Sequence, residues 1–355
     1  MSPSLRCVPA STGWRAHEGV QLKVGQRRTL IARAAILLLV LALVVWVASL
    51  TWNGISSALE HADRALWTVP VLVALHLVQL LLSSLSWRTL FASMARPRLA
   101  VFFRLRLIRE GIDSLLPVAQ IGGEVIGARL LTATGIPAAV AGASVVVDLT
   151  IELAGQILFL LAGLAALACL PGQTNWFLWL EVVAGAGLIV AAFLLAQHHG
   201  VLRLIEAAVR GLANRFPAFQ GASIEGLHAA ALGFYGRRAL VLRSALIHAF
   251  SWSLGTAETW LVLQAVGAAV TPLQALVVES LGMAARSAGF AVPAALGVQE
   301  GGFMLAAAAV GVSPELALAL SLIKRVREII VGLAGLFLWR LGKHQDLRGA
   351  RDGAG

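Results

Sequence analysis

Residues 117–124 read PVAQIGGE and residues 293–300 read PAALGVQE, at an offset of 176 residues (117 to 293). The alignment of the two stretches continues without a gap to Glu152 in the first copy. Coincident proline, glycine and carboxylates are harder to obtain by chance than matches of alanine in an alanine-rich chain. We therefore interpret the two stretches as an internal repeat, which places one carboxylate, Glu124 or Glu300, in each half of the chain. The further coincident positions are Gly135 with Gly311, Ile136 with Val312, and Glu152 with Glu328.

The composition is that of a polytopic membrane protein. Of 355 residues, 59% are hydrophobic and 13% charged, and the mean hydropathy is +0.83, far from the values of a soluble domain. Apolar runs near the roughly 20 residues that span a bilayer recur along the chain. We predict an all-α fold with six spanning helices, over residues 34–52, 67–92, 138–170, 175–197, 240–267 and 314–342.

Two segments between these spans fit poorly as simple crossings. Residues 101–134 and residues 273–311 are interrupted by proline and glycine, which break or reverse a helix. We predict a helical hairpin in each segment, either re-entrant or fully crossing. The alternative is that these residues only kink packed helices and permit close contact. The predicted breaks lie at Pro117, Gly122 and Gly123 in the first segment and at Pro293, Gly297, Gly301 and Gly302 in the second.

The formal charge of +10 reflects membrane topology. Basic residues gather in alternate connections between the spans, which is the positive-inside pattern with both termini cytoplasmic, and no nucleic-acid partner is predicted. Counting the crossings then makes the second repeat start on the opposite face from the first, so the repeats are predicted to be inverted, as in many transporters. The predicted organisation is a cytoplasmic segment 1–30, one transmembrane domain 31–342 with repeats 101–170 and 273–342, and a cytoplasmic tail 343–355.

Several functional classes lack their signatures in this sequence. Cys7 and Cys169 are far apart and have no metal-ligand spacing, and the histidines show no HExxH pattern. No phosphate-cradling glycine motif and no nucleophile with a neighbouring base is present. We therefore predict no metal, no cofactor and no enzymatic activity, and we expect the first span to be retained because no cleavage pattern accompanies it.

A carboxylate at membrane depth is costly and usually marks a functional interior. Glu124 and Glu300, with the adjacent Gln120 and Gln299, are candidates for binding a polar lipid head group or a proton. The alternative is that each carboxylate caps the backbone amides at a broken helix end, where negative charge is favoured. Both roles are compatible.

The long helices carry further charged residues. Asp148 corresponds to Lys324 in the repeat, as Glu110 does to Arg286, and we predict that Asp148 and Lys324 form a buried pair. The alternative partner of Lys324 is Glu328, four residues along the same helix. The remaining candidates for the binding site are Glu152, Arg286, Arg325, Arg327 and Glu328. Of these, Arg325 and Arg327 could bind phosphate.

These residues carry a family resemblance. The sequence resembles the flippase-like, lysylphosphatidylglycerol-synthase-type transmembrane family over about residues 30–342, through Gly122-Gly123-Glu124, residues 292–302 and the tail 319–328. The tail is similar to the hopanoid-biosynthesis-associated branch. In bifunctional members a membrane part is thought to move a lipid that a soluble domain makes. We expect no such soluble domain in this sequence, because about 13 residues follow its last predicted span.

The resemblance implies lipid translocation or transport in a bacterial cytoplasmic (inner) membrane, with hopanoids or their glycosylated forms as candidate substrates. The expected partners are therefore membrane lipids, with lipid-synthesis enzymes as further candidates. One alternative is a membrane enzyme that modifies a lipid with Glu124 or Glu300 as general base. The other alternative is a scaffold for lipid-synthesis enzymes, which would not need buried carboxylates.

Overall fold

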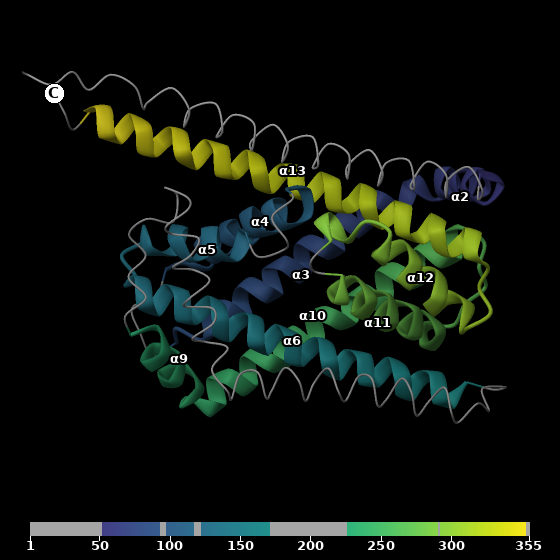
Figure 1. The fold of residues 1–355 in the computed structure, drawn as a ribbon, viewed down its shortest axis with the longest axis horizontal. Helices are drawn as coiled ribbons and strands as arrows, with labels where there is room; N and C mark the ends of the chain where they lie inside the picture. Colours follow the sequence, from purple (N-terminus) through teal and green to yellow (C-terminus); the bar gives the residue numbers. More distant parts are fainter. Residues whose placement is uncertain (1–51, 93–96, 117–121, 171–225, 290–291, 353–355) are drawn as a thin grey trace, which may run out of the picture. The chain divides into compact units, whose positions relative to one another are not determined.

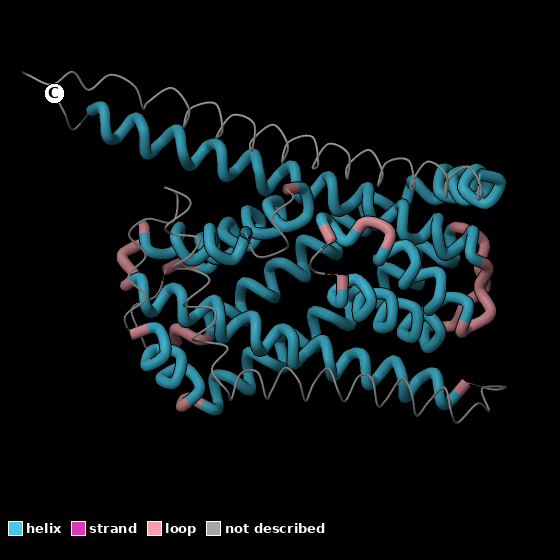
Figure 2. Tube along the Cα trace, viewed as in Figure 1, coloured by secondary structure: helices cyan, strands magenta, loops and turns pink. Residues whose placement is uncertain are grey.

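A computed structural model describes residues 52–92, 97–116, 122–170, 226–289 and 292–352 (Figure 1). Over these ranges every regular element is a helix, joined by short turns (Figure 2). The α-helices are α2 (Trp52–Ala65), α3 (Val69–Thr89), α4 (Leu99–Leu115), α5 (Gly122–Thr132), α6 (Ala138–Cys169), α9 (Leu227–Tyr235), α10 (Arg238–Ala265), α11 (Pro272–Ala288), α12 (Val298–Ala308) and α13 (Pro314–Asp352). Two 3₁₀ turns, Leu66–Thr68 and Pro293–Ala295, complete the set.

The structure is all-helical, as predicted, and several predicted segments coincide with its helices. The hairpin predicted over 101–134 is α4 with α5, and the one predicted over 273–311 is α11 with α12. The spans predicted at 138–170, 240–267 and 314–342 correspond to α6, α10 and α13. The span predicted at 67–92 corresponds to α3, whereas those at 34–52 and 175–197 lie outside the described residues, apart from Trp52 at the start of α2.

Helix ends follow from the local sequence. Helix α11 begins with Pro272 after Thr271, whose hydroxyl accepts from the Gln274 N–H while the Gln274 side chain accepts from the Thr271 N–H. This capping box satisfies backbone donors that a helix start leaves unpaired. Gly135 and Gly311 have φ angles of +89° and +79°, a conformation that glycine adopts without steric penalty, and each ends the hairpin before a long helix.

The bounds of the helices recur at the offset found in the sequence. Helices α5 and α12 both have 11 residues, and their first residues, Gly122 and Val298, are 176 positions apart. The same offset relates the first residues of α6 and α13, and also the two glycines with positive φ. The offset that suggests an internal repeat in the sequence therefore also relates these helix starts.

The first helix of each predicted hairpin packs on the long helix of the other repeat. Helix α4 of the first repeat packs along α13 of the second, and α11 of the second packs along α6 of the first. Both contacts lie within the compact unit Ser57–Gly355, where Figure 1 shows α6 and α13 on either side of the hairpins. The second helix of each hairpin, α5 or α12, packs on the long helix of its own repeat.

Equivalent positions meet in the two exchanged contacts. A Cβ added to Gly111 on α4 would lie 2.5 Å from the carbonyl oxygen of Gly332 on α13, so these backbones touch. The repeat equivalents of these two residues are Ser287 and Gln156, and the Gln156 amide donates to Ser287 Oγ at 2.5 Å. One contact is thus built on glycine and the other on a polar pair, at the same place in each repeat.

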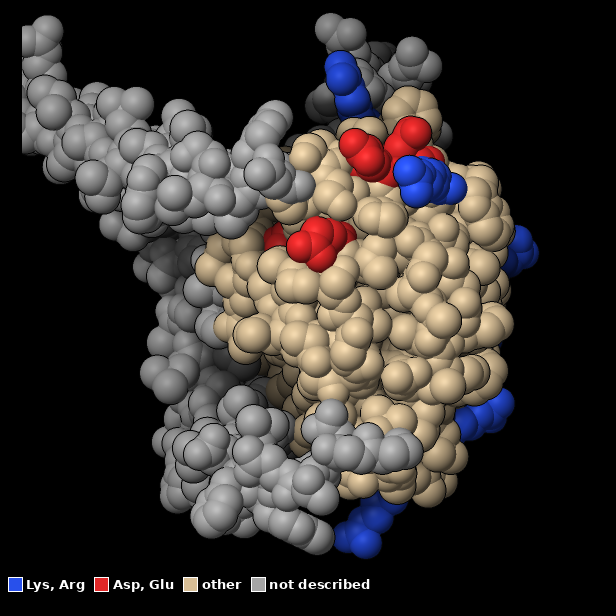
Figure 3. Space-filling view, turned by 90° about the vertical axis from the view of Figure 1, so that its right-hand side faces the viewer, with Lys and Arg blue, Asp and Glu red and all other residues tan. Residues whose placement is uncertain are grey.

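Within the described residues, two helical stretches are long and apolar enough to cross a membrane by length and composition: Ser56–Thr89 and Ala138–Cys169. Many large apolar side chains are exposed, among them Leu305 and Phe337. On the face drawn in Figure 3 most of the surface is uncharged, and charged side chains lie mainly toward its edges. Such large exposed apolar areas are unusual in soluble monomers and suit a lipid surface.

Candidate functional site

The break in the second hairpin is a strained turn held by an arginine. Ala294 and Ala295 have φ angles of +52° and +49°, values that are uncommon outside glycine. Arg325 on α13 donates to their two carbonyl oxygens, at 2.6 and 3.3 Å. A charged side chain from the neighbouring helix therefore satisfies the backbone acceptors that the break exposes.

Glu300 binds both the backbone next to this turn and the arginine that holds it. Its carboxylate accepts from the Gly297 N–H at 2.7 Å and from Arg325 Nε at 2.9 Å. The capping role predicted as an alternative is present, and the same carboxylate is part of an ion pair. The side chain keeps 20% of its exposure, so it is reachable from outside the protein core.

The first hairpin divides these roles between two residues. Asp113 accepts from the Gly123 N–H at 2.8 Å and so takes the capping position at the start of α5. Glu124 instead forms an ion pair with Arg109 of α4. The space above Gly123 is filled, because a Cβ there would meet the Asp113 carboxylate and lie 2.6 Å from the backbone carbonyl oxygen of Arg109. The glycine at this break is thus required by close packing.

Glu124 belongs to a larger buried cluster, the first charged network. The Arg106 guanidinium bridges Asp148 Oδ2 at 2.5 Å and Glu152 Oε2 at 3.0 Å, both on α6. Arg109 lies 3.5 Å from Asp148 Oδ2 and links it to Glu124. The first charged network consists of Arg106, Arg109, Glu124, Asp148, Glu152 and His248.

Trp87 of α3 supports the two arginines. Its ring centroid is 5.0 Å from the Arg109 guanidinium carbon and 5.9 Å from that of Arg106. Its indole N–H donates to Ser144 Oγ at 3.1 Å, which fixes the orientation of the ring. Arginine is attracted to the face of an aromatic ring, most strongly to tryptophan. The ring therefore packs under both cations at the buried end of the network.

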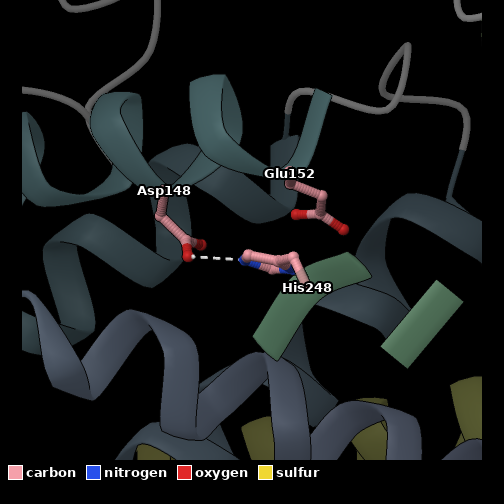
Figure 4. A group of neighbouring side chains, drawn as sticks. All are labelled: Asp148, Glu152 and His248. Carbon is pink, nitrogen blue, oxygen red and sulfur yellow. Dashed lines mark hydrogen bonds and ion pairs between the residues drawn. The ribbon is translucent and has the colours of Figure 1, made fainter. Parts of the chain in front are cut away.

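Asp148, Glu152 and His248 have the donor types and spacing of a metal site, with ligand atoms within 4.8 Å of one another (Figure 4). A divalent ion would need these oxygens at roughly 2.0–2.2 Å. The Arg106 guanidinium already bridges the two carboxylates, and its positive charge would oppose a metal cation. The residues present therefore fit an ion-pair network and do not fit a metal centre.

A second charged network lies between α10, α11, α12 and α13. Lys324 Nζ binds Glu279 Oε2 at 2.6 Å, and Arg327 pairs with Glu258, whose residue is fully buried. Glu328 on α13 pairs with Arg286 of α11. The second charged network consists of Glu258, Glu279, Arg286, Glu300, Lys324, Arg325, Arg327 and Glu328.

The predicted pair between Asp148 and Lys324 is wrong. Asp148 is bound by Arg106, Arg109 and His248, and Lys324 by Glu279. The alternative pair of Lys324 with Glu328 is also not formed. The physical reason is the direction of the side chains: Lys324 reaches α11, where a carboxylate is available, rather than along its own helix.

The other predicted residues are distributed as follows. Arg325 and Arg327 bind carboxylates in this structure, so their phosphate role stays a prediction. Gln299 is buried, with its amide 3.5 Å from Ser321 Oγ, and its oxygen has no partner among the described residues. Gly302 packs against Ala285, whereas Gly301 faces open space. Pro117 and Gln120 lie outside the described residues, as does the Pro293 side chain.

Sequence reasoning assigned no binding role to four residues of these networks. Arg106 and Arg109 follow the second predicted span, where the positive-inside pattern already explains basic residues, although their spacing of three places them on one face of a helix. Glu279 and His248 are isolated polar residues within the apolar helices α11 and α10. Such isolation inside a membrane helix is itself a signal of function.

The sequence pattern of the family described as lysylphosphatidylglycerol synthase TM region matches residues 30–335. No curated protein and no solved structure gave a match. The family match covers most of the chain, including both hairpins and both charged networks. The protein therefore belongs to the lysylphosphatidylglycerol synthase TM region family of multi-pass integral membrane proteins.

Proposed function

We propose that the protein is a flippase or transporter that moves an amphipathic lipid across or out of a bacterial cytoplasmic membrane. Its polar head group would pass between the two repeats while the acyl or ring portion stays in the bilayer. The proposal includes no catalytic step and no cofactor. Glu124 and Glu300, the general bases of the enzyme alternative, are each paired with an arginine, which supports transport over that alternative.

The observation that carries the proposal is that each network contains both fully buried and partly exposed charged side chains. In the first network Asp148 is fully buried, while the Glu152 side chain keeps 30% of its exposure. In the second, Glu258 is fully buried and Glu300 keeps 20%. Each network thus offers charged groups from the rim inward, which is what a head group needs in order to leave water without losing all polar partners.

The arrangement of the repeats supports the same proposal. An inverted orientation, with both termini cytoplasmic, would place the two hairpin breaks on opposite sides of the membrane midplane. The exchange of contacts between α4 with α13 and α11 with α6 is the pattern that a two-fold axis between the repeats would produce. Such repeats alternate access by moving against each other.

The chemical class of the substrate follows from the exposed groups. Glu300 and Arg325 are both partly exposed, at 20% and 14%, so a head group at the second break meets both signs of charge. A zwitterionic or hydroxyl-rich head group suits this pair. Hopanoids or their glycosylated forms are the specific candidates that the sequence of residues 319–328 suggests, and lipid-synthesis enzymes are proposed as partners.

The test compares lipids of separated inner and outer membranes from cells lacking the protein, complemented with the wild type or with Glu300→Gln. We expect total lipid species to be unchanged while one species shifts between membranes, and Glu300→Gln to fail in restoring it. Glu60→Gln is the matched control, because Glu60 is exposed on α2 and belongs to neither network. That variant should complement fully.

Two results would refute the proposal. If one lipid vanishes while its precursor accumulates in every membrane, the protein acts in synthesis. If Glu300→Gln complements as well as Glu60→Gln does, the carboxylate at the break has no part in the transport, as the scaffold alternative would have it.

A further inference from the structure

The two charged networks differ in their balance. In the second network four cations face four carboxylates, so it is neutral as it stands. In the first network two arginines face three carboxylates, and the remaining titratable member is His248. A net charge held away from water is expensive, so among the described residues a bound proton would balance the first network, whereas the second is balanced without one.

The geometry indicates which residue takes this proton. His248 is 1% exposed, and its Nε2 lies 3.3 Å from Asp148 Oδ1 (Figure 4). Asp148 Oδ2 is taken by Arg106 at 2.5 Å, which leaves Oδ1 facing the imidazole. A neutral imidazole gives the network a net negative charge, and a protonated one balances its arginines and carboxylates.

His248 is surrounded by charged groups of α6 and, behind them, by charged groups of α4 and α5. From α6 it faces Asp148 and Glu152, and behind them α4 presents Arg106 and Arg109. On the other described elements packed against α10, charged residues are engaged elsewhere or exposed. These are His76 of α3 at Glu110, Arg88 of α3 at the Pro97 carbonyl, the second-network residues of α11 and α13, and the exposed His228 of α9.

We propose that His248, with Asp148, is the binding site for a coupling proton that drives lipid movement. The proton comes from water on one side of the membrane, forms an N–H bond on the imidazole, and returns to water on the other side. Glu152, the most exposed carboxylate of the network, lies within 4.8 Å of the site and gives the proton a polar entry. The inference rests on the proposed transport but assigns a separate residue and a separate ligand.

The proton site is linked to the first hairpin. Asp148 shares Arg109 with Glu124, which stands in the first turn of α5 at the break. When His248 loses its proton, Asp148 loses a positive neighbour and draws more strongly on Arg109. The ion pair between Arg109 and Glu124 is weakened in the same step, so proton release weakens a contact between the two helices of the first hairpin.

The test uses the purified full chain in liposomes of extracted lipid, with a fluorescent analogue of the displaced lipid and a pH difference of one unit. One proton per lipid predicts a ratio between the leaflets of about tenfold at this gradient. His248→Gln should abolish the response to the gradient, measured relative to its own distribution without a gradient. Asp148→Asn should do the same, and His228→Gln, an exposed histidine, is the matched control that should respond as the wild type does.

A second readout does not depend on transport. The ring signals of labelled histidine in nanodiscs should include one that titrates, is shielded from a soluble paramagnetic agent, and disappears in His248→Gln but not in His228→Gln. If the wild type moves no lipid yet this signal titrates, the proposed transport fails and the proton site stands. A shielded signal that never titrates, or an undiminished response of His248→Gln to the gradient, overturns the inference.

Discussion

The ion pair between Lys324 and Glu279 allows a direct test of how the second charged network is held together. Lys324 Nζ and Glu279 Oε2 are 2.6 Å apart, and the residues are 1% and 3% exposed. Among the described residues, replacing Lys324 by Met leaves the Glu279 carboxylate with the Thr259 hydroxyl, which donates to it at 2.5 Å. Replacing Glu279 by Met leaves Lys324 with Glu258, whose carboxylate oxygen is 3.9 Å away.

The expected magnitudes differ sharply between the single and double variants. Removing one partner of a buried pair costs about 3–5 kcal/mol, since an uncompensated charge stays in the interior. If Lys324 and Glu279 were independent, the double variant would lose about 6–10 kcal/mol. Because both charges leave together, we expect the double Met variant to lose no more than either single variant.

The assay is the free energy of unfolding of the purified protein in mixed detergent micelles, measured for all four members of the cycle. The control cycle combines Lys324→Met with Asp148→Asn, which should add within about 0.5 kcal/mol because these residues share no partner. Additive losses for Lys324 and Glu279 would refute the pairing. A coupling of Lys324 with Asp148 would instead restore the pair inferred from repeat equivalence.

Two further predictions concern packing. Gly335→Ala should lower the free energy of unfolding by about 1–3 kcal/mol, because the new methyl group would lie 2.8 Å from the backbone carbonyl carbon of Leu107. The control is Gly301→Ala, which should be neutral or stabilising because its methyl group would meet nothing within 4 Å. Equal effects of the two substitutions in a thermal unfolding assay would contradict the predicted close packing at Gly335. Trp87→Phe should cost about 1–2 kcal/mol through the lost hydrogen bond to Ser144 and a weaker ring under the arginines, and an unchanged free energy of unfolding would show that the ring does not support them.

Within the described residues, the sequence predicts the limits of several helices well because these limits are set locally. Proline and glycine decide where a helix can start or must end, and a neighbour far along the chain changes this little. The long helix predicted at 138–170 is α6, Ala138–Cys169, and the start predicted at 314 is the first residue of α13. The positions of both hairpin breaks follow from the same residues.

The partners of the buried charges could not be predicted in this way. A charged residue on a helix has candidates on every neighbouring helix, and the choice depends on the rotation of each helix about its axis. Repeat equivalence suggested Lys324 for Asp148, yet Asp148 faces the arginines of α4 and His248 of α10. The repeat conserves the backbone positions, whereas its charges differ between copies: Arg106 corresponds to Gly282.

The crossed contacts between the repeats have a consequence for how the molecule holds together. The first helix of each hairpin packs on the long helix of the other repeat, much as subunits of a domain-swapped dimer pack an element on their partner. Neither half alone can cover α4 or α11 with the helix that packs there in the whole protein. The two halves should accordingly unfold as one cooperative unit, and a chain cut between α6 and α9 should recover its structure only when both fragments are present together.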